Sequence, residues 1–423
     1  MQRKGLREML IFHVDVNSAY LSWTAAALLE EGYHVDLRTI PSVIAGDPNN
    51  RHGIILTKSI PAKKYGIKTA DTLFEARKKC PQLQVFRPDY DLYLSCSNAM
   101  HDLLSEYSPK IQRYSVDESF CDMTDSPEAK EDSVKLAHKI KDRIKHELGF
   151  TVNIGIGMNK LCAKMAGELK KPDMVHTLWP EEIPDKLWLL PVGELFMVGR
   201  ATEKKLKKFS ITTIGELAKA DPIFLKSILK SHGILVHDYA NGIDDDPVTV
   251  NNEIVQKGLG NGLTYPYDME TKEELSKELL ALCERVGGRL RKMQKTASLV
   301  SVHLRSSDLH GYSHQIKLAS PIDTTDEIYE MAGNLIDEMW KGEPVRAMSV
   351  SVSELSSDRP VQLTMFDLKD REKARKLDSA VDNIRKLFGE RSIFRGTFAN
   401  SEISPIQGGV NDGNYLMMGG FKT

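Results

Sequence analysis

Residues 111–122 read IQRYSVDESFCD, and the adjacent acids Asp117 and Glu118 in this stretch decide how the chain is interpreted. The flanking residues predict a short strand that the charged pair interrupts. Side chains in a strand alternate between its two faces, so neighbouring acids do not share a face by default. A polar turn at a strand end is the simpler explanation of an isolated pair of acids. A third acid nearby is needed to favour a metal-binding site.

The third acid, Asp15, lies in LIFHVDVNSAY, residues 10–20. An apolar run rich in strand-forming residues ends at Asp15, and a predicted helix, residues 19–31, follows it. Backbone N–H groups at a helix start favour an anion, and Mg²⁺ is typically held by one or two carboxylates together with phosphate oxygens. The three acids would supply enough carboxylates for two metals about 3.5–4 Å apart.

The composition is that of an ordinary globular protein. Of the 423 residues, 41% are hydrophobic and 27% are charged, and the formal net charge of −2 means that any basic surface must be local. No apolar run approaches the roughly 18 residues that span a membrane, and the N-terminal apolar stretch is too short for a signal peptide. The five cysteines form no CxxC pair, which indicates neither zinc nor a disulfide framework. We therefore expect a cytoplasmic protein.

Positive charge is concentrated in residues 200–209, RATEKKLKKF, which follow the turn LFMVG. A second predicted helix, with Thr213 as its cap, comes next. Helices joined by a tight glycine turn with basic residues are typical of a helix-hairpin-helix, which holds DNA phosphates on backbone amides. A solvated helix face is the alternative explanation of these lysines.

Residues 259–357 predict a compact α/β unit with one polar sheet face. A long amphipathic helix begins near Lys272 and ends in a basic cluster. The elements expected after it are strands at 299–306 and 312–320, a helix at 323–340 and a strand at 345–355. In the first of these strands, Ser301, His303 and Arg305 alternate with apolar residues and so share one face. Such a face suits a nucleic-acid backbone, and mere hydration is the alternative.

Two further segments place lysines near the start of a turn or helix. They are SIPAKKYGI, which holds Lys63, and GIGMNK, which ends on Lys160. Two lysines that converge on a polyphosphate, with metals on its other side, are the arrangement expected for a nucleoside triphosphate. No GxxxxGK[ST] occurs, so the site is not a P-loop. Either lysine alone is more simply a solvated surface residue.

In order and spacing, the motifs HVDVNSAY, SIPAKKYGI, SVDESF, GIGMNK and MVGRATEKKLKKF resemble those of Y-family DNA polymerases of the DinB/UmuC kind. The resemblance covers residues 8–395. It implies an α+β, multidomain right-hand polymerase with a ferredoxin-like palm and a helix-hairpin-helix in a helical thumb. The implied domains are the palm (8–18 and 89–178), small fingers (19–88), thumb (179–248), linker (249–258), α/β little finger (259–357) and C-terminal tail (358–423).

The resemblance also implies roles for individual residues. The metal-binding carboxylates would be Asp15, Asp117 and Glu118, and the carbonyl of Val16 would complete a site for two Mg²⁺, with Mn²⁺ as a possible substitute. The nucleotide would be bound by Ser18, Ala19 and Tyr20, of which Tyr20 matches the aromatic residue that excludes a ribose 2′-hydroxyl. The lysines on the triphosphate would be Lys63 and Lys160.

DNA contacts are implied for Gly199, Arg200 and Lys204 in the thumb, and for Ser301, His303 and Arg305 in the little finger. The chain departs from the family pattern at two places. Ile60 stands where many relatives have a tyrosine that touches the triphosphate, and the hairpin reads MVGRA rather than the more usual GIG type.

Residues 362–367, QLTMFD, are similar to the sliding-clamp motif of bacterial polymerases. The residues that would bind the clamp are Gln362, Leu363, Met365 and Phe366. A short strand or a chance apolar cluster is the alternative. A helix at 369–388 is predicted next, and the Gly/Asn-rich end of the chain is expected to be flexible.

The predicted function is template-directed, error-prone DNA synthesis past damaged bases. Its partners would be primer–template DNA, dNTP and a bacterial sliding clamp, and the protein would be a monomer. A nucleotidyl cyclase shares the two-metal chemistry but has no use for the hairpin, the polar sheet or the clamp motif. Loss of one of the three acids would favour a non-catalytic DNA-binding relative, and all three are present.

Overall fold

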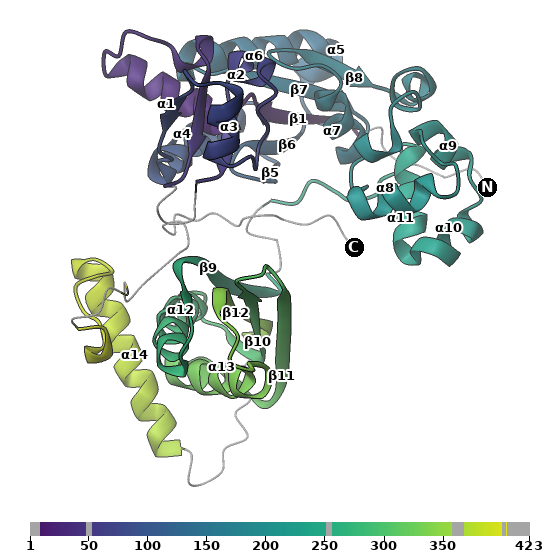
Figure 1. Cartoon of the computed structure of the whole chain (residues 1–423). Coiled ribbons are helices and arrows are strands. Elements are labelled where there is room, and N and C mark those ends of the chain that lie inside the picture. The colour runs from purple at the N-terminus through teal and green to yellow at the C-terminus, as the bar shows by residue number, and fades with distance from the viewer. Residues whose placement is uncertain (1–8, 48–52, 251–255, 358–367, 400–402, 404–423) are drawn as a thin grey trace. The chain divides into compact units, whose positions relative to one another are not determined.

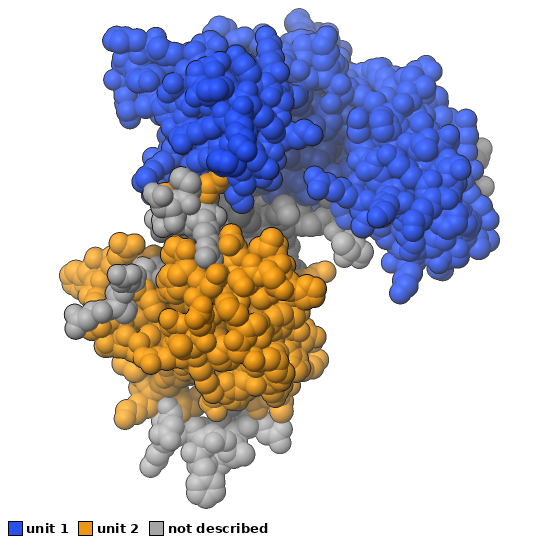
Figure 2. All heavy atoms as spheres, viewed as in Figure 1, with its two compact units in different colours: residues 1–46, 54–254, 412–423 blue, residues 47–53, 255–411 orange. Residues whose placement is uncertain are grey.

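The computed structural model describes residues 9–47, 53–250, 256–357, 368–399 and 403. The chain divides into two compact units, shown in Figure 2. Of the described residues, 9–46 and 54–250 belong to the first unit, and 47, 53, 256–357, 368–399 and 403 belong to the second. Each unit has an apolar core of its own. Among the described residues, no helix combines the length and the apolar character needed to cross a membrane.

The first unit is built around a five-stranded sheet of order β5-β6-β1-β7-β8 (Figure 1). The central strand β1 runs antiparallel to β6 and β7, and β8 is parallel to β7. The strands are Ile111–Arg113 (β5), Glu118–Asp122 (β6), Ile11–Val16 (β1), Val152–Gly157 (β7) and Val175–Leu178 (β8). Every residue of β1 is buried, which explains its nearly continuous apolar sequence.

Alternate residues of β1 face two different layers. Phe12, Val14 and Val16 belong to a core formed with helices on one face of the sheet. The helices are Ala19–Glu30 (α1), Tyr90–Ser105 (α4), Pro127–Glu131 (α5) and Ser133–Leu148 (α6). By alternation, Asp15 points to the opposite face, which α7 (Lys160–Glu168) covers. The first acid therefore lies on the α7 side of the sheet.

Helix α7 packs very close to the sheet because β7 carries glycines where the two touch. A Cβ at Gly155 would lie 2.0 Å from the carbonyl oxygen of Ala163, and one at Gly157 would lie 2.7 Å from the Ala163 nitrogen. A larger residue would force the helix to move. The glycines of GIGMNK are therefore a packing requirement that sets the height of α7 above the carboxylates.

Two smaller modules complete the first unit. One is a sheet of order β3-β2-β4 with its own apolar core, made of Ser42–Ala45 (β2), Ile55–Lys58 (β3), Gln84–Phe86 (β4), Ile60–Lys64 (α2) and Leu73–Lys79 (α3). The other is a helical cluster that shares a core with α7, made of Arg200–Lys207 (α8), Ile214–Lys219 (α9), Pro222–Leu229 (α10) and Ser231–Ala240 (α11). The predicted cap Thr213 is confirmed, and it forms a capping box with Glu216.

The second unit pairs an antiparallel sheet of order β11-β10-β12-β9 with two helices. Its elements are Gly258–Met269 (β9), Lys272–Lys292 (α12), Thr296–Ser306 (β10), Gly311–Ile322 (β11), Thr325–Met339 (α13) and Val345–Ser356 (β12). The predicted helix start at Lys272 and the three later strands are confirmed. β9, rich in glycine, is an addition that the sequence patterns did not predict.

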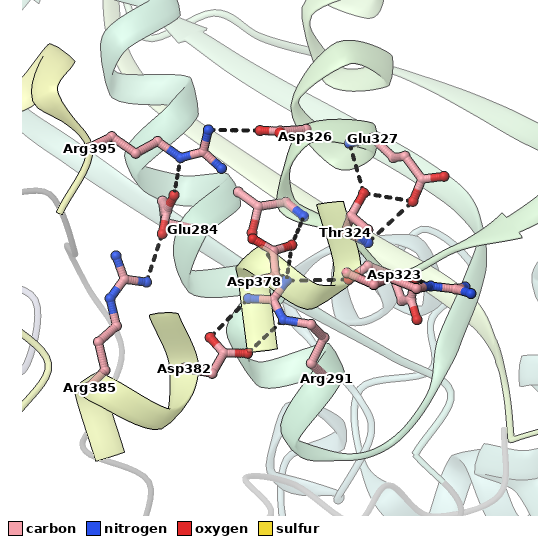
Figure 3. A network of polar contacts seen from close by, with 12 residues as sticks. Glu284, Arg291, Asp323, Thr324, Asp326, Glu327, Asp378, Asp382, Arg385 and Arg395 are labelled. Atoms are coloured by element: carbon pink, nitrogen blue, oxygen red, sulfur yellow. Dashed lines mark hydrogen bonds and ion pairs between the residues drawn. The ribbon is translucent and has the colours of Figure 1, made fainter. Parts of the chain in front are cut away.

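The C-terminal helix α14 (Leu368–Phe388) is attached to the second unit by ion pairs, drawn in Figure 3. Arg291 of α12 donates to Asp382 at 2.6 Å and to Asp378 at 2.9 Å. Arg385 donates to the buried Glu284 at 2.7 Å. The predicted helix at 369–388 is confirmed, and its charged side faces the unit on which it packs.

Candidate active site

The acidic stretch forms a hairpin rather than one interrupted strand. β5 and β6 pair antiparallel, and the N–H groups of Tyr114 and Ser115 donate to the carbonyl of Glu118 at 2.9 and 3.2 Å. Glu118 is the first residue of β6, and Asp117 lies in the turn before it. The turn releases the two adjacent acids from the strict alternation of a strand.

Strand pairing brings Asp15 to this hairpin. Asp15 lies directly opposite Glu118 in the register of β1 and β6, and opposite residues have their Cβ atoms about 4.5–5.5 Å apart on one face. The N–H of Val16 donates to the carbonyl of Asp117 at 3.0 Å. The structure therefore brings the three predicted carboxylates and Val16 together at one end of β1.

Asp15 is paired with a lysine that the motifs did not single out. It is 6% exposed and accepts a hydrogen bond from Lys171, which also pairs with Glu168 at 2.9 Å. Burial raises the pKa of Asp15 to about 7, and the ammonium of Lys171 limits that rise. Burial opposes the charge of Lys171 as well, but the two carboxylates raise its pKa overall. Lys171 therefore stays charged beside Asp15.

Glu118 is held by two donors on the same oxygen. His13 Nε2 lies 3.1 Å and Lys164 Nζ lies 2.5 Å from Glu118 Oε2. Burial would raise the pKa of Glu118, but the two donors lower it to about 2. The Lys164 ammonium also lies 5.2 and 5.5 Å from the ring centroids of Tyr114 and Phe196. Glu118 is therefore ionised throughout the physiological pH range.

Asp117 accepts a hydrogen bond of 2.5 Å from the Ser115 hydroxyl, and burial raises its pKa. Tyr20, in the first turn of α1, stacks on Tyr93 with ring centroids 4.7 Å apart. Burial and the charge of Asp117 raise the pKa of Tyr20 to about 12. The Tyr20 phenol is therefore neutral and within electrostatic reach of the acids.

Within the described part of the chain, no three His, Cys, Asp or Glu side chains are already gathered as ligands of one metal ion. Each acid is turned instead to a partner of its own, as described above. The donor set nevertheless fits Mg²⁺, because it consists of carboxylate oxygens at one end of β1. Two of these carboxylates are neutralised by ammonium groups that a bound cation could replace.

Lys160 does not lie at the carboxylates. It is 1% exposed, and its Nζ donates to Gln112 at 3.1 Å and to Asp246 at 2.5 Å. Asp246 belongs to the segment that follows α11. The structure thus places Lys160 in a clasp that ties this segment to α7, and puts Lys171 at the acids. The sequence signal for Lys171 is the lysine pair of LKKPD, just beyond the helix that GIGMNK opens.

The remaining residues predicted in the first unit are exposed, except Ala19. Ser18 has a left-handed backbone (φ 51°) at the head of α1, and Ala19 follows it as a buried residue. Lys63 is exposed on α2, and burial together with the charge of Lys63 lowers the pKa of Lys58. Gly199 caps α8, where a Cβ would meet nothing within 4 Å. The exposed Arg200 and Lys204 follow on that helix.

The residues predicted in the second unit share one sheet face. His303 and Arg305 are exposed on β10, and Ser301 is half-buried. Ser301 lies opposite Ser351 and His303 opposite Ser349, both on β12, so the polar face extends across the sheet. The predicted clamp motif 362–367 lies outside the described residues.

Comparison with known proteins decides the family. Profiles of the impB/mucB/samB family and of its C-terminal domain match residues 14–168 and 256–365. The DNA polymerase IV of Clostridium acetobutylicum is 48% identical over 393 residues, which cover 93% of this chain and 99% of that protein. The chain belongs to the Y family of DNA polymerases. As a DinB-like bacterial member of this family, it is a DNA-directed DNA polymerase of the translesion type.

Further Y-family proteins are similar to this chain in sequence or in fold. DNA polymerase IV 1 of Bacillus subtilis is 34% identical, over 95% of this chain and 96% of that protein. The Y-family chimera Dbh-Dpo4(243-245)-Dbh shares the fold with a TM-score of 0.72, at 22% identity, over 83% of this chain and 100% of that chain. A Dbh ternary complex covers 82% of this chain and 99% of that one, with a TM-score of 0.57 and 23% identity.

Proposed function

We propose that Asp15, Asp117 and Glu118 hold two Mg²⁺ ions and the incoming dNTP at the point where a primer 3′-hydroxyl is extended. The observation that most supports this is the β1–β6 register, which sets Asp15 opposite Glu118 with Asp117 in the adjoining turn. When bound, the metals would activate the hydroxyl and neutralise the triphosphate and the leaving pyrophosphate. The carbonyl of Val16 would complete one site, and Mn²⁺ would substitute for Mg²⁺.

Two lysines have a defined task in this proposal. In the free protein, Lys171 and Lys164 neutralise Asp15 and Glu118, and an arriving cation would release them. An ammonium released from Asp15 remains beside the triphosphate that the same metal binds. We therefore assign to Lys171 the phosphate contact that the resemblance gives to Lys160. Lys63, exposed on α2, would be the second phosphate contact.

Tyr20 would select deoxyribose. The acids fix the metals and hence the triphosphate, and Tyr20 begins the helix that follows β1, so it can lie beneath the sugar of the same nucleotide. Its ring is held by stacking on Tyr93. A ring held in this way leaves room for the hydrogen at C2′, whereas a hydroxyl would clash. Ser18 and Ala19 would present backbone groups to the triphosphate.

DNA would be held by two surfaces. At the start of α8, the open space beside Gly199 would let a phosphate approach its backbone, and Arg200 and Lys204 add charge. In the second unit, the polar face of β10 with Ser301, His303 and Arg305 would lie along the DNA backbone. Small side chains allow this face to approach DNA closely, because serines of β12 pair there with glycines of β9.

A sliding clamp would dock on residues 362–367. Leu363, Met365 and Phe366 would fill an apolar groove, and Gln362 would form a hydrogen bond at its rim. Contacts of this kind tether the polymerase to DNA without a change at the active site. We propose that the polymerase itself acts as a monomer.

Primer extension in Mg²⁺, with and without a template strand, tests this assignment. Asp117→Ala should abolish incorporation while DNA binding survives, because phosphate contacts elsewhere hold the DNA. Asp102→Ala is the matched control, since its carboxylate is 83% exposed on α4, and it should behave as the wild type. Activity of Asp117→Ala above a few per cent of the wild type would show that the metal assignment is wrong.

A further inference from the structure

His13 is a buried polar residue beside the acids to which the mechanism above gives no task. It lies in β1, two residues before Asp15, so both side chains point to the α7 side of the sheet. It is 0% exposed, and its Nε2 lies 3.1 Å from Glu118 Oε2. An ionised carboxylate oxygen can only accept. Nε2 therefore carries the proton and donates to Glu118.

The surroundings of His13 hold the ring in this orientation. The ring packs against Phe120 with centroids 4.7 Å apart. Gly167 of α7 also lies close to the ring, and a Cβ there would come within 3.3 Å of Nδ1. Nδ1 is buried and has no hydrogen-bond partner among the residues that the structure describes. An unpaired buried acceptor is unfavourable, so the placement of the ring is explained by the bond that Nε2 makes.

His13 and Lys164 donate to the same oxygen but respond differently to a metal ion. Lys164 carries a positive charge, so a cation that binds Glu118 must displace it. An imidazole needs no positive charge to donate through Nε2–H, so His13 can hold Glu118 as a neutral ring that does not repel a cation. The hydrogen bond from His13 can therefore persist after the metal has bound.

We infer that His13 is a positioning residue of this polymerase, whose Nε2–H holds the Glu118 carboxylate in its metal-binding orientation before and after Lys164 leaves. The inference rests on the proposed role of Glu118 as a metal ligand. Hydrogen bonds to ligating groups from outside the coordination shell typically contribute roughly 10–100-fold in metal affinity or activity. An effect of that size is expected here.

The test compares three full-length variants with the wild type. His13→Gln retains an amide donor near the position of Nε2, whereas His13→Phe and His13→Met fill the space without a donor. Binding of Mn²⁺ alone is followed by electron paramagnetic resonance, and kcat and KM for dNTP are measured in Mg²⁺. The variants without a donor should lose roughly 10–100-fold in Mn²⁺ affinity and in kcat. His13→Gln should stay within a few-fold of the wild type.

Wild-type Mn²⁺ affinity in a folded His13→Phe or His13→Met protein would overturn the inference. A loss in His13→Gln as large as in the other two variants would overturn it as well. Urea unfolding identifies folded variants, and the Met variant carries the test if the Phe variant does not fold. Failure of the metal assignment itself gives a different result, because Glu118→Ala would then bind Mn²⁺ as tightly as the wild type.

Discussion

Two lysines of the first unit should give different phenotypes when each loses its ammonium: one variant should bind dNTP less well, and the other should be less stable. In Lys171→Met, the KM for dNTP should rise by roughly 10–100-fold, because a charge-assisted hydrogen bond to phosphate is worth about 1.5–3 kcal/mol. Stability should change less than in a Lys160 variant, because Lys171 is 34% exposed and the buried Asp15, with a pKa of about 7, can take up a proton when the ammonium is lost. The neighbouring Lys170, which is also exposed, supplies the control Lys170→Met, and this variant should alter neither quantity.

The magnitude for Lys160 follows from its burial. Its side chain is 1% exposed, and that of its partner Asp246 is 14% exposed. Removal of one partner from a buried ion pair costs about 3–5 kcal/mol, because the other charge is left uncompensated. Asp246 keeps some contact with water, so we expect Lys160→Met to lower the free energy of unfolding by about 3 kcal/mol. The double variant Lys160→Met/Asp246→Leu should recover most of this loss.

Both quantities are directly measurable. The KM for dNTP comes from single-nucleotide primer extension, and the free energy of unfolding comes from urea denaturation followed by circular dichroism. A Lys160→Met protein of wild-type stability with a raised KM for dNTP would refute the reasoning and return the phosphate contact to Lys160. An unchanged KM in Lys171→Met would remove Lys171 from the triphosphate site.

Three further predictions concern sugar choice, pH and the clamp. Tyr20→Ala should raise the kcat/KM for rCTP relative to dCTP by orders of magnitude opposite a template guanine, and an unchanged ratio would return Tyr20 to the core. Because the pKa of Asp15 is about 7, protons compete with Mg²⁺ below that pH. Mg²⁺ affinity should therefore fall as the pH drops through about 7 and level off above it, whereas equal affinities at about pH 6 and 8 would contradict this. Changing Leu363 and Phe366 to Ala should leave distributive synthesis intact but abolish stimulation by a bacterial sliding clamp. Unchanged stimulation of the double variant would show that the clamp docks on another segment.

Periodicity and capping predict most of the second unit, and the exception has a physical reason. α12 and the strands after it carry regular patterns and a capping box at Thr271. β9 does not, because glycines normally weaken a strand. Here the neighbouring strand requires them, since a Cβ at Gly262 would lie 2.4 Å from that of Ser349. The need for glycine in β9 arises from contact with β12, so it cannot be recognised from the sequence of β9 alone.

The acids of the site are predictable from the sequence, whereas their partners are not. The acids stand at strand ends within recognisable motifs. Lys164 and Lys171 reach them only because glycines in β7 allow α7 to pack closely on the sheet. Lys160 illustrates the limit. It lies one helical turn before Lys164, a rise of about 6 Å along α7, and its Nζ pairs with Asp246, whereas that of Lys164 pairs with Glu118.

The two best-defined carboxylates differ in charge before any metal binds, and this difference suggests an order of events. Glu118 has a pKa of about 2 and is always ionised, because His13 and Lys164 outweigh its burial. Asp15 has a pKa of about 7, because burial outweighs the single ammonium of Lys171. Glu118 therefore carries a full negative charge, which the Lys164 ammonium balances until a cation replaces it, whereas Asp15 carries only a partial charge. We expect the cation to be attracted first by Glu118, and Asp15 to lose its proton as it joins the coordination. Proton release on Mg²⁺ binding at about pH 6.5, measured by calorimetry in buffers of different ionisation enthalpy, should accordingly disappear in Asp15→Asn but persist in Glu118→Gln.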